Sequence, residues 1–459
     1  MRCHAYIGTV FATICTLAVS SLRADDPVNR DSILDWNSIA LSVTVVDHSG
    51  TLGAPQQGGP TRTSRSLAIV HAAMFDALNS IVPTAKPYLT QINGAGGSID
   101  AAVATAARQT LRSLYSAQVS EIDRQYVQYL ATIPASSGKS LGIRIGNRIA
   151  QRLLAARSHD GSSAIMNYSP TGELGDHDVD PLNPLQGFLT PGWGDVTSFA
   201  LSAAFDFQSP PPPDLESDEY ARAYQDVMLY GGDGINTPTI RSARQTEIGL
   251  FWAYDGTRRI GVPPRLYNQI VRVISNRMRN DEVTNARLFA LVNLAMADAG
   301  VVCWETKYEF RFWRPILGIR NGDLDANDAT DGDTAWSPLG APASNQSGNN
   351  FTPPFPAYSS GHATFGAATF GILSRFYHRD NIAFTFVSDE LNGVTTDWQG
   401  NVRPLRPRRF TSLHAAALEN ARSRIYLGIH WQFDADEGVA CGDAIAEDIS
   451  RHELLPTPN

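Results

Sequence analysis

The spacing of apolar residues constrains the fold of this chain more than any other feature of its sequence. Over long stretches apolar side chains recur three or four residues apart, the period of an amphipathic helix, whereas convincing alternating strands are absent. The clearest stripes in the first half are Leu67, Val70, Met74 and Leu78 (after Ser64 as a candidate N-cap and before Pro83), then Val103, Ala107, Leu111 and Leu114, then Leu141, Ile145, Ile149 and Leu153. The first half is therefore predicted to be helical.

The second half carries the same signal. Helices are predicted over 217–230, 244–256, 263–278, 286–300, 361–377, about 411–428 and about 435–452, and the stretch 286–300 is apolar on nearly every side, as in the centre of a bundle. Two segments lack periodicity: 162–215 is rich in Pro, Gly and Asp, and 321–356 is a long loop. We expect an all-α protein of two helical bundles, with 25–215 as the N-terminal bundle and Pro-rich linker and 216–459 as the C-terminal bundle that contains the active site.

The N-terminus is typical of a secretory signal peptide. Arg2 precedes the apolar run IGTVFATICTLAV, which is too short to span a membrane comfortably. We expect residues 1–24 to be removed near Ala24 and the mature chain to be secreted or periplasmic; a buried N-terminal helix is the alternative. No other apolar run is judged long enough to span a bilayer. Two cysteines would remain, Cys303 and Cys441, and they could pair or stay buried.

The overall charge narrows the choice of partners. The 37 Lys and Arg residues are outnumbered by 46 Asp and Glu, which gives a formal charge of −9. A nucleic-acid-binding protein would carry a basic face, so this class is disfavoured, although a local basic pocket is not. The acidic stretch 323–333 departs from a calcium-binding EF-hand loop, because Asp328 and Thr334 stand where glycine and glutamate are required. A solvated loop is expected there.

Three segments of the second half carry the residues of a chemical site. The first, WETKYEFRFWRP, holds Lys307 and Arg314 seven residues apart, a spacing that places both cations on one face of a continuous helix. Such a pair is commonly a solvated face. The aromatic residues around it indicate burial instead, and buried cations need an anion.

The second segment is FPAYSSGHATFG. Its prolines end any preceding helix, and Ser359 or Ser360 can cap the next one. Gly361 lets the backbone approach a ligand, and the first N–H groups of the helix make a site for an oxyanion. His362 lies in the first turn of this helix. A surface or capping role is the plainer alternative for a lone histidine at this position.

The third segment is SRIYLGIHWQFDAD. Arg424 and His430 are six residues apart, which a straight helix would aim in different directions, but Gly428 allows the helix to end and the chain to turn back. Asp434 can orient an imidazole or pair with an arginine, an exposed N-cap being its alternative role. Together the three segments predict a pocket for a tetrahedral or trigonal-bipyramidal oxyanion, in which a neutral histidine can bond the central atom.

These motifs resemble a known superfamily. Lys-x6-Arg-Pro, Ser-Gly-His and Ser-Arg-x5-His, in this order, are similar to the signature shared by vanadium haloperoxidases and type 2 phosphatidic-acid phosphatases. Residues 250–436 resemble the vanadium chloroperoxidases more closely, through FWAYDG, PPRLYNQIV, LGAPASN and ENARSRIYLGIHWQFDA. DWNSIAL and GGPTRTSRSLAIVHAAMFDALNS resemble the N-terminal bundle of bacterial members. The resemblance covers most of the mature chain.

The resemblance implies a vanadate cofactor and a role for each matching residue. His430 would bond vanadium, and His362 would be the acid–base group beside it. The vanadate oxygens would be held by Lys307, Arg314, Ser360, Gly361 and Arg424, Lys307 also polarising bound peroxide. Asp255 would support Arg424, and Trp304 and Phe355 would flank the halide, where phenylalanine favours the chloride type. Ser359 replaces a proline usual in the family, a change that concerns loop rigidity rather than the ligands.

The expected activity is that of a secreted vanadium-dependent haloperoxidase, which oxidises chloride or bromide with hydrogen peroxide to hypohalous acid and so halogenates a small organic acceptor. The nearest alternative is a secreted acid phosphatase with His430 as nucleophile, His362 as proton donor and Asp434 orienting His430. A non-catalytic binder of phosphate or sulfate is a third possibility, which the two histidines disfavour. The sequence leaves open the physiological halide, the acceptor, the occupancy by vanadate or phosphate, and the oligomeric state.

Overall fold

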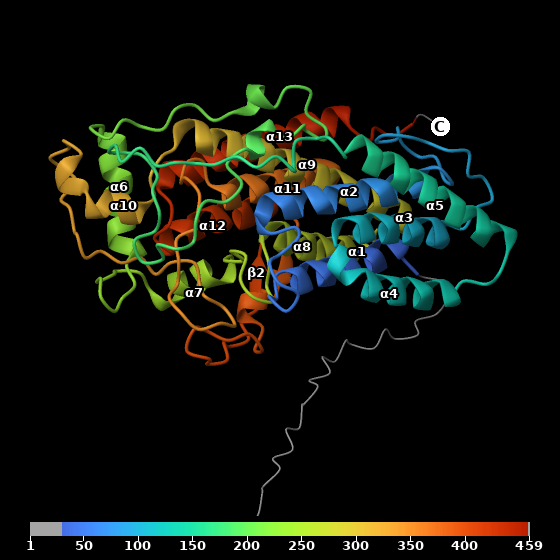
Figure 1. The fold of residues 1–459 in the computed structure, drawn as a ribbon, viewed down its shortest axis with the longest axis horizontal. Helices are drawn as coiled ribbons and strands as arrows, with labels where there is room; N and C mark the ends of the chain where they lie inside the picture. Colours follow the sequence, from blue (N-terminus) through green and yellow to red (C-terminus); the bar gives the residue numbers. More distant parts are fainter. Residues whose placement is uncertain (1–29, 458–459) are drawn as a thin grey trace, which may run out of the picture.

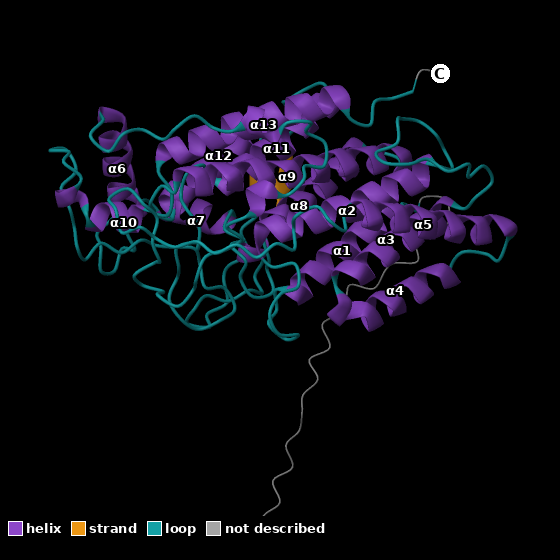
Figure 2. Ribbon diagram, turned by 45° about the horizontal axis from the view of Figure 1, so that its top comes forward, coloured by secondary structure: helices purple, strands orange, loops and turns teal. Residues whose placement is uncertain are grey.

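The computed structural model describes residues 30–457, and its framework is helical (Figures 1 and 2). The helices of the first half are α1 (Ser32–Asp47), α2 (Gly59–Asn79), α3 (Ile99–Leu114), α4 (Val119–Ala131) and α5 (Ser137–Ala156). Those of the second half are α6 (Asp218–Gly231), α7 (Ala243–Phe251), α8 (Pro263–Met278), α9 (Glu282–Phe310), α10 (Pro315–Arg320), α11 (Gly361–Phe376), α12 (Leu413–Tyr426) and α13 (Gln432–His452). The predicted signal peptide, residues 1–24, lies outside the described residues and stays a prediction.

The predicted all-α class is confirmed. Among the described residues, regular strands are confined to one antiparallel pair, β1 (Phe384–Phe386) and β2 (Arg408–Phe410), in which Phe384 faces Phe410 and Phe386 faces Arg408. The short 3-10 helices are η1 (Ser116–Gln118), η2 (Trp193–Asp195), η3 (Ala204–Phe207), η4 (Gly322–Leu324) and η5 (Asp389–Leu391). The segments 162–215 and 321–356 contain only such 3-10 turns, as their composition predicted.

The start of α2 differs from the prediction. The helix begins at Gly59, with Gly58 as N-cap and Pro60 in the first turn, so Ser64 lies inside the helix rather than capping it. The Ser64 hydroxyl donates to the carbonyl of Thr61, one turn back, at 2.8 Å. Proline is well tolerated in the first turn of a helix, where its missing N–H would have no intrahelical acceptor.

Helix α9 is the centre of the molecule and packs against helices of both halves. It contacts α2 of the first half and α11 of the second. On length and composition this helix could cross a membrane, so the expectation that no further apolar run is long enough was wrong. Its most apolar 18-residue window, however, is 94% buried inside the protein. A helix that is apolar on every side is typical of a bundle core as well as of a membrane span.

Both halves share one apolar core. A continuous cluster of buried side chains runs from Ile33 in α1 to Leu454 beyond α13, and a second cluster surrounds Trp431 near the active-site region. Because this cluster spans both halves, it does not mark a domain boundary near residue 215, and that boundary stays a prediction. The choice left open for the cysteines is resolved: Cys303 and Cys441 are buried free thiols.

Candidate active site

The two cations of the first motif do not lie on one continuous helix. Helix α9 ends at Phe310 because Arg311 adopts a left-handed conformation with φ 54°, and the chain then turns. Lys307 lies in the last turn of α9, whereas Arg314 directly precedes α10, which begins at Pro315. The prediction that Lys307 and Arg314 share a helix face was wrong, although both side chains are fully buried.

The loop 355–359 gathers these two cations. The Lys307 ammonium donates to three backbone carbonyls of the loop at 2.5–2.9 Å, and the Nε of Arg314 donates to the Phe355 carbonyl at 2.8 Å. Burial, together with the nearby charge of Arg314, lowers the pKa of Lys307 from 10.5 to about 7. The loop therefore compensates the desolvation of the cations with carbonyl dipoles.

His430 is held in one tautomer by an anion and a cation. Its Nδ1 lies 2.8 Å from the Oδ2 of Asp434, and its Nε2 lies 2.9 Å from the Nη1 of Arg314. Because a guanidinium only donates, Nε2 is the acceptor and Nδ1 carries the proton. Asp434 is fully buried, and burial raises its pKa to about 7, while burial lowers the pKa of His430. Of the two roles considered for Asp434, the structure therefore favours orientation of the imidazole over an exposed cap.

Arg424 is positioned by a second carboxylate. It lies in the last turn of α12, and its Nη2 donates to both oxygens of Asp255 at 2.7 and 2.9 Å. Helix α12 ends at Tyr426, and Gly428, with φ 72°, turns the chain so that His430 returns toward the same pocket. Burial raises the pKa of Asp255, and the charge of Arg424 opposes this rise. The expected turn at Gly428 is confirmed.

His362 presents one ring nitrogen to the pocket. Its Nε2 lies 2.5 Å from the carbonyl oxygen of Ala253, so Nε2 carries the proton and Nδ1 is left as an acceptor. Nδ1 is 4.0 Å from Asp255. Burial, followed by the charge of Arg424, lowers the pKa of His362 well below its ordinary value, which favours the neutral ring. A neutral imidazole in this position can accept a proton from a ligand.

The second motif forms the N-terminus of α11. Ser360 is the N-cap residue, but its side chain makes no capping hydrogen bond, and its Oγ is buried without a partner among residues 30–457. Gly361 begins the helix, and a Cβ atom there would lie 3.3 Å from the Trp304 ring. The backbone at Gly361 can thus come close to a ligand beside this aromatic wall.

Several buried donors around His430 have no acceptor among residues 30–457. They are Nη2 of Arg314, Nε and Nη1 of Arg424, and the hydroxyl of Ser360. Unpaired buried N–H groups are costly, and an oxyanion would satisfy them together. Within the same range no cluster of three or more His, Cys, Asp or Glu residues could hold a metal cation. The residues present fit an oxyanion such as vanadate, and a ligand bonded to the Nε2 of His430 would replace its hydrogen bond with Arg314.

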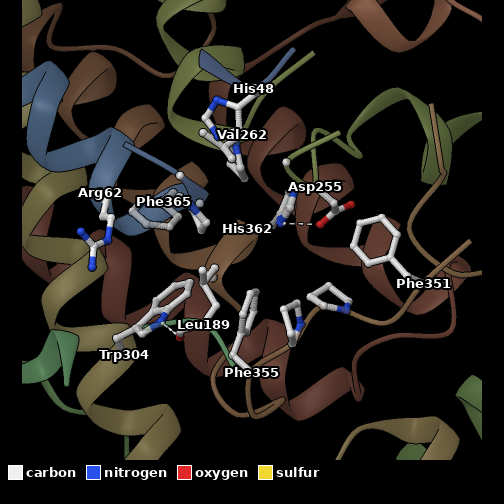
Figure 3. A pocket seen from close by; sticks show the side chains of 18 of the residues that line it. His48, Arg62, Leu189, Asp255, Val262, Trp304, Phe351, Phe355, His362 and Phe365 are labelled. Carbon is white, nitrogen blue, oxygen red and sulfur yellow. Dashed lines mark hydrogen bonds and ion pairs between the residues drawn. The ribbon is translucent and has the colours of Figure 1, made fainter. Parts of the chain in front are cut away.

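A cavity of about 470 Å³ opens onto these groups (Figure 3). Of the predicted site residues, its wall includes Asp255, Trp304, Phe355, Gly361, His362, Arg424 and His430. The rings of Trp304 and Phe355 lie 4.8 Å apart at 50° and form one apolar side of the cavity. Lys307, Arg314, Ser360 and Asp434 are buried behind this wall. All the predicted site residues are therefore brought to one region.

The sequence did not indicate the contribution of the first half to this cavity. Gly58, Gly59, Pro60 and Arg62 from the start of α2, and His48 after α1, also line it. The segment 162–215 does more than join the halves, because the Leu189 carbonyl accepts hydrogen bonds from Trp304 and Tyr308. No residue spacing connects these distant segments with the three motifs, so their place in the cavity wall could not be predicted from the sequence.

The fold and this geometry define a helical protein whose buried cations and histidines bind an oxyanion. Two family models match it: the vanadium chloroperoxidase N-terminal domain over residues 21–189, and the second helical-bundle domain of the same enzymes over residues 287–454. The vanadium chloroperoxidase of Curvularia inaequalis is 35% identical over 521 aligned positions, which cover 95% of this chain and 82% of that protein.

Solved structures share the fold. A bacterial vanadium-dependent iodoperoxidase superimposes with a TM-score of 0.75 at 20% identity, covering 95% of this chain and 99% of that one. A bacterial vanadium-dependent chloroperoxidase in its holo form superimposes with a TM-score of 0.64 at 17% identity, covering 88% and 95%. From the family models and the fungal relative, the chain belongs to the vanadium haloperoxidase family.

Proposed function

We propose that this protein is a secreted, chloride-type vanadium haloperoxidase that oxidises halide with hydrogen peroxide to hypohalous acid. One observation carries the proposal: the unpaired buried donors of Arg314, Arg424 and Ser360 surround His430, the nitrogen ligand that vanadate requires. When bound, vanadate supplies a Lewis acid that activates peroxide toward a halide.

His430 would bond vanadium through Nε2, because its Nδ1 proton is committed to Asp434. Arg314, Arg424, Ser360 and the Gly361 N–H would hold the oxyanion, the two guanidiniums through their unpaired nitrogens. Lys307 would join them by giving up one of its three carbonyl partners. His362 would accept a proton at Nδ1 from peroxide, since its Nε2 proton is bound to a backbone carbonyl. Asp255 and Asp434 are positioning residues, because each acts through the cation or imidazole that it contacts.

The chloride assignment rests on Phe355. Its ring packs against Trp304 and lies 5.1 Å from the Lys307 ammonium, so the halide side of the cavity combines an apolar wall with positive charge. An apolar, water-poor wall suits oxidation of the halide that is hardest to oxidise, because desolvation strengthens the electrostatic interactions of the site.

The purified mature protein tests the proposal. We would remove phosphate, divide the sample with and without orthovanadate, and supply peroxide, chloride or bromide, and a chromogenic acceptor, beside a phosphatase assay. We expect vanadate-dependent chloride oxidation that is lost in His430→Ala. Bromide oxidation alone would keep the haloperoxidase and reject the role of Phe355. Ester hydrolysis inhibited by vanadate, without halogenation, would replace the proposal with the phosphatase.

Secretion has a separate test. The full-length chain is expressed in a host with a secretory pathway, and the N-terminus of the exported protein is sequenced. We expect it to begin at Asp25, directly after Ala24. Retention of residues 1–24 in an intracellular product would contradict secretion without affecting the proposed chemistry.

A further inference from the structure

The cavity wall contributed by the first half carries polar groups that halide oxidation does not use. Arg62 and His48 both line the cavity, together with the backbone at the start of α2. In Figure 3, Arg62 lies across the cavity from Asp255, and His48 lies across it from Phe355. These groups therefore stand apart from the oxyanion site within the same cavity.

The N-terminus of α2 faces the cavity without a capping side chain. Gly58 is the N-cap residue, and Gly59 follows with φ 77°; a Cβ atom on Gly59 would lie 2.7 Å from the Leu189 side chain. A side chain there would strain the backbone and displace the end of the Leu189 side chain. The first N–H groups of a helix lack intrahelical acceptors, and the helix dipole favours an anion beside them.

Arg62 adds an uncompensated charge to this helix end. It is half-buried, and within residues 30–457 no carboxylate pairs with its guanidinium, which lies 6.0 Å from the centre of the Trp193 ring. By contrast Arg65, one turn along the same helix, pairs with Asp160 at 2.7 Å. A cation that lines a cavity beside a helix N-terminus is suited to bind an anionic group of a ligand.

His48 supplies a hydrogen-bond acceptor. The residue is 5% exposed, and its Nδ1 donates to the Thr44 carbonyl at 2.9 Å, so Nε2 carries the lone pair of the neutral ring. Nε2 is buried and has no partner among the described residues. A buried acceptor without a donor is rare in native proteins, and a ligand hydroxyl would satisfy it.

The remaining surface between these groups is apolar. Leu189, Val262, Phe351, Phe355 and Phe365 line it, with prolines from 353–354. A cavity of about 470 Å³ with apolar walls and a few polar points is typical of a small-molecule site, and aromatic walls favour a flat aromatic body.

We propose that this cavity binds an aromatic acceptor that bears a carboxylate and a phenolic hydroxyl. Arg62 and the α2 N-terminus bind the carboxylate, and the Nε2 of His48 accepts the hydroxyl proton in a hydrogen bond. This inference rests on the proposed function, which supplies hypohalous acid beside the Trp304 and Phe355 wall. Halogenation would then occur on a bound acceptor rather than only on molecules outside the protein.

Halogenation of the bound ring needs no reactant besides hypohalous acid. A ring carbon attacks the halogen of hypohalous acid, so a carbon–halogen bond forms while the halogen–oxygen bond breaks. Hydroxide leaves and takes the ring proton, which gives water and the halogenated ring. A phenolic hydroxyl activates the ring toward this attack, and a hydrogen bond from that hydroxyl to His48 increases its electron donation.

Binding to the vanadate-loaded mature protein tests the inference without turnover. Calorimetric titrations compare 4-hydroxybenzoate with 4-hydroxybenzamide, which lacks the charge, and with benzoate, which lacks the hydroxyl. We expect 4-hydroxybenzoate to bind about tenfold more tightly than either analogue. Arg62→Gln should remove the preference over the amide and Arg62→Lys should keep part of it, while His48→Phe should remove the preference over benzoate.

Arg148→Gln is the matched control, because Arg148 is an exposed arginine of α5 that forms no ion pair within residues 30–457. It should leave both preferences intact. Equal binding of acid and amide by the wild-type protein, an unchanged preference in Arg62→Gln, or release of vanadate on addition of the acid would overturn the inference. The last result would mean that the carboxylate competes for Arg314 and Arg424.

A competition assay separates this inference from the proposed function. The vanadate-loaded protein receives peroxide, halide, and an equimolar mixture of the acid and the amide, and the ratio of halogenated products is compared with that given by free hypohalous acid. We expect a ratio shifted about tenfold toward the acid, and a shift lost in Arg62→Gln. Halide oxidation with the unshifted ratio rejects acceptor binding alone, whereas selective binding without halide oxidation rejects the proposed function alone.

Discussion

Phe355 is the residue on which the proposed preference for chloride rests. Its ring contacts Trp304 and lies 4.9 Å from the Arg314 guanidinium and 5.1 Å from the Lys307 ammonium. Phe355→His would place a polar, hydrated ring against the halide. We expect the ratio of kcat/KM for chloride to that for bromide to fall by about tenfold, equivalent to about 1.4 kcal/mol.

Steady-state assays with both halides measure this ratio. Phe351→His is the matched control. Phe351 lines the same cavity, but among residues 30–457 its ring forms no aromatic pair with Trp304, as that of Phe355 does. An unchanged ratio in Phe355→His, or an equal change in the control, would remove Phe355 from halide selection.

Asp434 sets the tautomer of His430. Its Oδ2 accepts hydrogen bonds from the His430 Nδ1 at 2.8 Å and from the Trp431 N–H at 3.0 Å. Asp434→Asn keeps the volume but removes the charge that increases the basicity of Nε2. We expect the affinity for vanadate to fall about 10- to 100-fold, as for other residues that orient a metal-ligating histidine.

Equilibrium dialysis with orthovanadate measures this affinity apart from turnover. Asp436→Asn, an exposed change on the same helix, should bind as the wild type does. If Asp434→Asn retains the wild-type affinity, His430 does not depend on this carboxylate for its orientation.

At the scale of elements, periodicity predicted most helices but missed where two of them end: α7 ends at Phe251 rather than at residue 256, and α9 ends at Phe310. The limits of α8 and α11 agree with the sequence within one residue, because Pro263 and the Ser-Gly pair mark their starts. The break after Phe310 has no such marker: Arg311 is neither glycine nor proline, yet it adopts the left-handed conformation. Lys307 and Arg314 were therefore correctly assigned to one site for an incorrect geometric reason.

The close packing of α13 against α11 gives a prediction about stability. A Cβ atom on Gly442 would lie 2.3 Å from the Thr364 carbonyl oxygen and 2.9 Å from the Ala367 Cβ. Gly442→Ala must therefore push apart the helices that carry His362 and Asp434. We expect it to destabilise the protein by about 1–3 kcal/mol, despite the higher helix propensity of alanine.

Urea unfolding followed by circular dichroism measures this change. Ala440→Ser, at an exposed position of α13, should alter the free energy of unfolding by less than about 0.5 kcal/mol. Equal stability of Gly442→Ala and the wild type would show that the two helices can separate at no cost.

At the scale of the whole molecule, the chain brings its two halves together through contacts that local sequence does not encode. The three motifs could be assigned to one pocket because each holds charged residues in a recognisable spacing. His48 and Arg62 have no such spacing with them. Arg62 reaches the cavity because α2 packs on α9, and His48 because α1 packs on α8 and α9. That the three motifs come together was thus predictable from sequence, whereas the opposite wall was not.

One such contact between the halves makes stability depend on pH. The Oε1 of Glu282, at the start of α9, accepts hydrogen bonds from the N–H and the hydroxyl of Ser32 in α1. Burial raises the pKa of Glu282 from 4.5 to about 7. The native state therefore binds a proton that the unfolded chain has lost, and the resulting stabilisation is complete below about pH 4.5 and is lost as the pH rises through about 7.

Glu282→Gln keeps the accepting oxygen but cannot ionise, so its free energy of unfolding should not include this dependence. Between pH 5 and pH 8 we expect the wild type to lose up to about 2–3 kcal/mol relative to Glu282→Gln, as measured by urea unfolding at each pH. Glu121→Gln, a change at an exposed carboxylate on α4, should give a curve parallel to that of the wild type. Parallel curves for the wild type and Glu282→Gln would mean that Glu282 titrates alike in the folded and unfolded chains, and that the junction of α1 with α9 stays accessible to water.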